Sequence, residues 1–104
     1  MIEVIEKIDA IEEYEDGGVD LIIYCHERID NAIGTQVRLM DKVEFYLDVK
    51  KTDEFKQQYS GSNIMNVTII LQLKYEPTEL IKELSCRIAE WTDYYNAKFV
   101  WSVK

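Results

Sequence analysis

The sequence is poor in residues that interrupt or cross-link a chain, with one proline, four glycines and two cysteines among 104 residues. Two cysteines cannot supply the disulfide framework on which small secreted domains depend. The longest apolar run, residues 21–25, is far shorter than the roughly 20 residues of a membrane-spanning helix. No basic stretch followed by an apolar run opens the chain. The sequence therefore predicts no secretion signal, no membrane partner and a cytoplasmic location.

Catalytic signals are equally scarce. There is one histidine, and the glycine-rich phosphate-binding, zinc-protease and paired-cysteine motifs are absent. His26 follows Cys25, but neighbouring residues of a strand point to opposite faces, so we expect no thiol–imidazole pair. Cys25 is predicted to be a core thiol and Cys86 an exposed one, both free. We predict no catalytic residue, no metal site and no cofactor, and a protein that is not an enzyme.

The sequence is rich in apolar residues, at 47%, and in aromatic residues, at 12%. A chain of this length with that composition can bury a core, which excludes a disordered chain. Linker-like and low-complexity stretches are absent. We therefore predict a single domain over residues 1–104.

Negative charge is concentrated at the start of the chain. Residues 1–20 carry eight acids and one lysine, a net charge of −7, whereas residues 21–104 carry twelve acids and eleven bases, a net charge of −1. A field of this sign repels nucleic acid and attracts basic proteins. Two interpretations stay open: a solubilising hairpin, or an edge that docks onto a basic partner.

The first half of the chain predicts a β-hairpin followed by a helix. Residues 8–14 and 19–25 form the two strands, because the Asp-Gly-Gly of residues 16–18 supplies the positive φ angles that tight turns require. A helix is predicted over residues 31–50, with Asp30 or Asn31 as its N-cap. Its expected buried stripe is Ile33, Val37, Met40, Val43 and Leu47. A short helical turn is expected within residues 52–59.

The second half predicts strand, helix and strand. Apolar and polar residues alternate over residues 65–76, which indicates a strand with one buried face. Pro77 and Thr78 begin a helix, because proline suits a first helical turn and threonine can cap it. Asn96 ends this helix, and residues 98–103 form the last strand. The expected stripe of this helix is Leu80, Leu84, Ile88, Trp91 and Tyr95. The predicted fold is α+β, a two-layer sandwich of order β-β-α-β-α-β, with a mixed four-stranded sheet and two helices on one face.

The uncovered face of this sheet carries apolar residues among polar ones. They are Ile22, Tyr24, Ile70 and Val100. Scattered surface residues of this kind are ordinary, whereas a contiguous patch would favour a homodimer through the open sheet face. Both interpretations stay open.

Four segments resemble a family of small acidic bacterial proteins that is itself uncharacterised: Ile-Asp-Ala-Ile (8–11), Val-Asp-Leu-Ile-Ile (19–23), Lys-Val-Glu-Phe-Tyr-Leu (42–47) and Lys-Tyr-Glu-Pro (74–77). Genes of this type, where a role is assigned, are similar to immunity genes beside contact-dependent growth inhibition toxins. The resemblance implies an immunity protein that binds a cognate basic toxin domain, expected to be a nuclease, and blocks its active-site surface. The alternative is a non-enzymatic interaction or scaffold protein. The predicted partner-binding residues are Glu12, Glu13, Glu15, Asp16, Asp20 and Tyr24.

Overall fold

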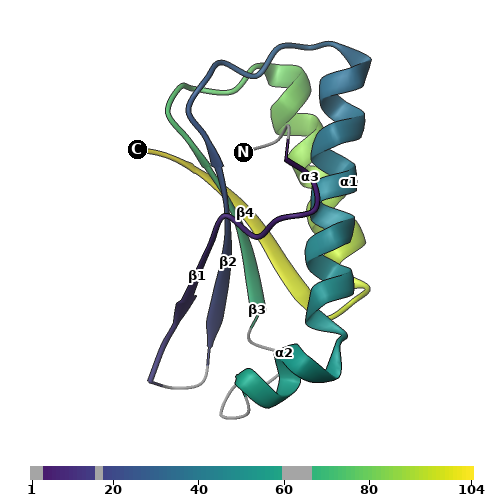
Figure 1. The fold of residues 1–104 in the computed structure, drawn as a ribbon. Helices are drawn as coiled ribbons and strands as arrows, with labels where there is room; N and C mark the ends of the chain where they lie inside the picture. The colour runs from purple at the N-terminus through teal and green to yellow at the C-terminus, as the bar shows by residue number, and fades with distance from the viewer. Residues whose placement is uncertain (1–3, 16–17, 60–66) are drawn as a thin grey trace.

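The computed structural model describes residues 4–15, 18–59 and 67–104, and Figure 1 shows their arrangement. The strands are β1 (Ala10–Glu13), β2 (Val19–Cys25), β3 (Val67–Leu73) and β4 (Ala97–Val103). The helices are α1 (Ile33–Lys50), α2 (Asp53–Gln58) and α3 (Glu79–Asp93). In the described part of the chain, no helix is long and apolar enough to cross a membrane.

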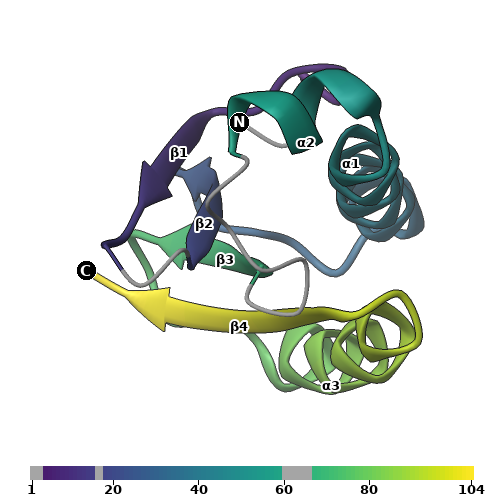
Figure 2. The same ribbon diagram turned by 90° about the horizontal axis from the view of Figure 1, so that it is seen from below.

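The four strands form one mixed sheet in the order β1-β2-β3-β4. β1 pairs antiparallel with β2, whereas β2 with β3 and β3 with β4 pair in parallel. Each parallel pair is joined through a helix, α1 followed by the short α2 in the first case and α3 in the second (Figure 2). The predicted α+β fold with a mixed four-stranded sheet is confirmed, and α2 lies within the predicted helical turn.

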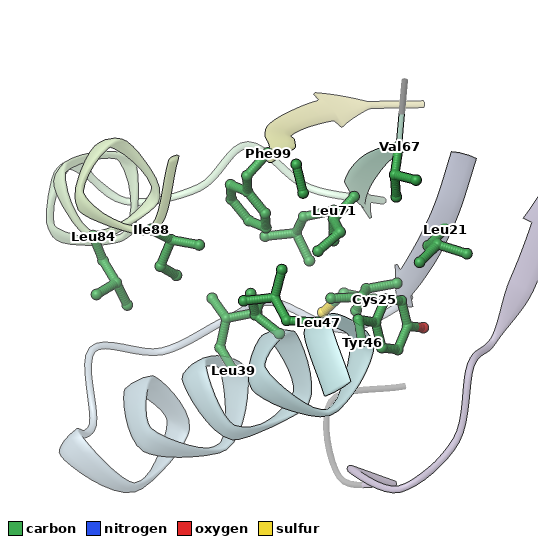
Figure 3. Packing of buried hydrophobic residues seen from close by; sticks show 14 of the residues in the cluster. Leu21, Cys25, Leu39, Tyr46, Leu47, Val67, Leu71, Leu84, Ile88 and Phe99 are labelled. Atoms are coloured by element: carbon green, nitrogen blue, oxygen red, sulfur yellow. The ribbon is translucent and has the colours of Figure 1, made fainter. Parts of the chain in front are cut away.

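The core lies between the sheet and the two long helices. Alternate residues of β3 are buried, as the period-two pattern predicts. The predicted strand extended from Met65 to Glu76; β3 ends at Leu73, and Met65 lies outside the described residues. Figure 3 shows Leu39 of α1 and Ile88 of α3 meeting strand residues in this cluster.

The predicted buried stripe of α1 is wrong in its first half. Ile33 is 78% exposed, and Val37 and Met40 are also exposed. The residues that α1 buries are Thr35, Leu39, Lys42, Val43, Tyr46, Leu47 and Lys50. Hydropathy treats lysine as a surface residue, yet Lys42 and Lys50 pack their aliphatic stems inward, and their ammonium groups reach oxygen acceptors. A buried ammonium group is tolerated when it is paired or hydrogen-bonded, so lysine can occupy the buried face of α1 at these two positions.

The predicted stripe of α3 is correct at Leu84 and Ile88, and Leu80 and Trp91 are half-buried, but it is wrong at Tyr95, which lies beyond the end of the helix. Tyr95 is exposed, and the buried set is Ile81, Leu84, Ser85, Ile88 and Thr92. The Thr92 hydroxyl donates to the Ala89 carbonyl within the same helix, at 3.1 Å. Since that bond satisfies the hydroxyl, threonine can face the core.

The N-termini of α1 and α3 differ in their capping. Thr78 caps α3 as predicted, because its hydroxyl accepts a hydrogen bond from the Ile81 N–H at 3.3 Å. The predicted caps of α1 are wrong: Ala32 occupies the N-cap position, and its side chain makes no cap. The Asp30 carboxylate instead accepts from the Ala32 N–H and the Thr35 hydroxyl, so it orders the preceding loop. Asn96 follows α3 with a φ of 60°, as a predicted helix stop should.

Both cysteines are free, Cys25 buried and Cys86 exposed, as predicted. The Cys25 thiol donates to the Glu27 carbonyl at 3.2 Å. His26 is exposed and stacks on Tyr24. The thiol and the imidazole therefore diverge, as expected for neighbours at a strand end.

Candidate functional site

The acidic hairpin presents carboxylates on both faces of its outer strand. In the register of β1 with β2, Glu12 lies opposite Asp20 and Glu13 opposite Val19. Paired residues share a face, so Glu12 and Asp20 lie together on the open face of the sheet, and Glu13 lies on the helix side. Glu12, Glu13 and Glu15 are all exposed. We call these three residues the acidic edge. Asp16, the fourth predicted acid of the turn, lies outside the described residues.

Asp20 differs from the acidic edge because its carboxylate is held within the hairpin. The Tyr14 hydroxyl donates to Asp20 Oδ2 at 2.6 Å. This hydrogen bond, together with partial burial and the charges of Asp20 and Glu12, raises the pKa of Tyr14 to about 12. The Tyr14 N–H also donates to the Gly18 carbonyl at 2.8 Å. Tyr14, which helps to fix the shape of the hairpin, was not among the residues predicted from the sequence.

Tyr24 does not join the acidic residues. It lies four residues beyond Asp20 along β2, which corresponds to about 13 Å at the rise of a strand. Its neighbours line a hollow of about 300 Å³ at the carboxyl ends of β2 and β3, among them His26, Lys74 and Lys104. The predicted partner-binding set therefore separates into an acidic part and an aromatic part with basic surroundings.

A buried polar network attaches the base of the hairpin to α1. Lys42 Nζ lies 2.9 Å from Asp9 Oδ1, and the other oxygen of Asp9 accepts from the Tyr24 N–H at 2.9 Å. Burial alone would raise the pKa of the Asp9 carboxyl. The hydrogen bonds that the carboxylate accepts and the charge of Lys42 lower the pKa by more than burial raises it, so the pKa lies below its usual value. The carboxylate is thus ionised in the folded protein at neutral pH.

Tyr46 completes this network from the same helix. Its hydroxyl donates to the Ile22 carbonyl at 2.7 Å and accepts from the Asp9 N–H at 2.9 Å. Burial raises the pKa of Tyr46, and the charge of Asp9 adds to the effect. Lys42 also donates to the Val4 carbonyl at 2.7 Å, which holds the N-terminal segment against α1. The network positions both the hairpin and this segment.

A groove runs between the N-terminal segment and α1, with a volume of about 670 Å³. Its lining residues are Val4, Ile5, Glu6, Asp41, Glu44, Phe45 and Asp48. We call it the α1 groove. In Figure 1 the N-terminal segment passes alongside α1 before it enters β1.

The α1 groove could not be predicted from the sequence because acidic and basic residues are mixed along α1. Lys42 and Lys50 point inward, however, so the exposed charged residues between Asp41 and Asp48 are all acidic. The spacing of Asp41, Glu44 and Asp48, three and then four residues apart, was the available signal. In the segments that the structure describes, no three His, Cys, Asp or Glu side chains are grouped to hold a metal ion.

The comparison with protein families covers the whole chain. Residues 1–104 match the model of DUF6572, a family of unknown function. The chain belongs to this family. No curated protein matches this DUF6572 chain. No solved structure matches it either.

Proposed function

We propose that this protein is a non-enzymatic bacterial immunity protein, which binds a cognate basic toxin domain and covers its active-site surface. The observation that carries the proposal is the acidic edge, where Glu12, Glu13 and Glu15 are exposed at one end of the sheet. A nuclease toxin is the expected partner, because a nuclease must present basic groups to the phosphates of its substrate. The acidic edge would occupy those groups in place of nucleic acid.

Electrostatics predicts which step of binding the acidic edge controls. Exposed charges act over about 8 Å at physiological ionic strength. They therefore attract a basic surface before contact and raise the association rate more than the final affinity. The bonds of Tyr14 to Gly18 and Asp20 hold the hairpin in shape, so little ordering entropy is lost on binding.

The direct test is co-expression with the product of the adjacent gene. We expect the two proteins to co-purify, and we expect this chain to protect cells from that product. If a toxic neighbour neither co-purifies with the chain nor is neutralised by it, the proposal is wrong.

A charge-matched pair of variants tests the role of the acidic edge. The triple variant E12Q/E13Q/E15Q should associate more slowly at low salt, show a flatter salt dependence and lose about 0.5–1 kcal/mol of affinity per neutralised residue. The control variant E83Q/E90Q/D93N removes the same charge from exposed positions of α3 and should behave like wild type. Equal association rates for the two variants would show that the hairpin only aids solubility.

A second candidate is an interaction or scaffold protein that dimerises through the open sheet face. The register supports it, because Ala10, Ile22, Ile70 and Val100 are successive partners and form an apolar row across all four strands. Val100 is exposed at one end of this row and Ala10 and Ile70 are half-buried, whereas Ile22 is buried despite its predicted place on the uncovered face. Sedimentation over a range of concentrations should then show a dimer that Val100→Glu abolishes. A monomer at every concentration would exclude this candidate.

A further inference from the structure

We propose that the α1 groove is a second docking surface, which takes a cationic amphipathic segment of a partner protein. The inference rests on the proposed function only in assuming that this partner is the same basic protein. The α1 groove and the acidic edge are built from different elements, so each can be removed without the other.

The floor of the α1 groove is apolar and accessible. Val4 is 50% exposed, Ile5 and Phe45 are half-buried, and all three line the groove. A volume of about 670 Å³ is within the range of 300–1,000 Å³ usual for pockets that hold a ligand. An apolar side chain from a partner would therefore find both space and apolar contacts here.

At the rim of the α1 groove, the charged residues that the structure describes are all acidic. They are Glu6, Asp41, Glu44 and Asp48. Among the described residues, none of these four carboxylates takes part in an ion pair. A segment that sets lysine or arginine heads on either side of an apolar residue would match both rim and floor. An acidic or purely apolar segment would not.

The spacing along α1 is unfavourable for the isolated helix. Asp41, Glu44 and Asp48 stand three and four residues apart, where like charges repel. Two cations flank this part of the helix. Arg38 donates to the Thr35 hydroxyl, and Lys51 lies over the Tyr95 ring in a hollow that Glu44 and Asp48 also line, without an ion pair to either acid among the described residues. Repulsion retained beside an apolar groove is expected where binding, rather than folding, requires the charges.

The probe for the test is a fluorescein-labelled amphipathic helical peptide of leucine and lysine, and its counterpart with glutamate in place of lysine is the control. Fluorescence anisotropy should show binding of the lysine peptide alone. The variant D41N/E44Q/D48N should weaken that binding by about tenfold, and its melting temperature should rise, because the repulsion is removed. The charge-matched E83Q/E90Q/D93N and the acidic-edge variant E12Q/E13Q/E15Q should each weaken it less than about threefold.

Two further measurements distinguish docking in the α1 groove from nonspecific electrostatic attraction between the peptide and the acidic protein. Val4→Ser should weaken the lysine peptide at high salt, where charge is screened and the apolar floor dominates. Amide NMR shifts on addition of the peptide should concentrate at residues 41–48. Equal losses in all three charge variants, or shifts centred on the hairpin, would overturn the inference. Such a result would not affect co-purification with the product of the adjacent gene. Conversely, if co-purification fails while the lysine peptide still binds in the α1 groove, only the proposed function is wrong.

Discussion

Breaking the ion pair between Lys42 and Asp9 is expected to remove a large part of the stability of the fold. Lys42 is fully buried, the Asp9 side chain is 7% exposed, and Nζ lies 2.9 Å from Oδ1. Loss of one partner of a buried pair costs about 3–5 kcal/mol, because the remaining charge keeps its desolvation penalty without its counterion. Total stabilities of domains are about 5–15 kcal/mol. Asp9→Ala should therefore lower the melting temperature by more than about 10 °C.

A double-mutant cycle isolates the pair, with urea unfolding followed by tryptophan fluorescence as the assay. Asp9→Asn with Lys42→Met removes both charges, and methionine replaces much of the lysine stem. We expect the double variant to lose less stability than the sum of the single changes, by about 1–3 kcal/mol. Lys82→Met is the control, since Lys82 pairs with Glu76 and Glu79 at the surface. Its cost should not exceed about 1 kcal/mol.

The comparison between Asp9→Ala and Lys82→Met decides whether the buried ion pair stabilises the fold more than a surface pair does. If the two variants lose the same stability, the buried pair contributes no more than a surface pair. Pairing with a buried carboxylate would then fail to explain why Lys42 points into the core.

Three further predictions concern single groups. Because folding lowers the pKa of Asp9, its contribution to stability is present above pH about 4 and is lost as the pH falls through the folded pKa. In urea titrations, the stability difference between wild type and Asp9→Asn should therefore shrink below pH about 4. A difference that stays constant with pH would contradict this. Cys86 should react with a thiol reagent in the native protein and Cys25 only after unfolding, whereas equal rapid labelling would show the burial to be wrong. Tyr14 should titrate at about 12 by NMR, and Asp20→Asn should move this pKa toward 10; an unchanged value would exclude the hydrogen bond as the cause.

The strands could be predicted from the sequence because the alternation of apolar and polar residues is enough to identify them. In β3 every second residue is apolar, and a period of two places those residues on one face whatever their partners are. The stripe of α1 could not be predicted in the same way. Burial of Lys42 depends on Asp9, 33 residues away in the chain, and no local pattern announces that contact.

The contact between Lys42 and the N-terminal segment also explains why only part of the candidate site could be predicted from the sequence. The acids of the hairpin are adjacent in the chain, so a count of charge found them. The α1 groove depends on two lysines turning inward and on Val4 being held against the helix by Lys42. Tyr24 was grouped with the acids because its place on the open face was predicted without its distance from them along β2.

The two parallel pairings of the sheet differ in the length of chain that must close before they form. Forty-one residues separate the end of β2 from the start of β3, and 23 separate β3 from β4. Closure entropy grows with the logarithm of loop length, so the longer connection costs about 0.5 kcal/mol more. The β3-α3-β4 unit is therefore favoured as the earlier element of the folding nucleus. Lys42 would find its acceptors, the Asp9 carboxylate and the Val4 carbonyl, only later, when β2 joins the sheet and brings the N-terminal segment with it.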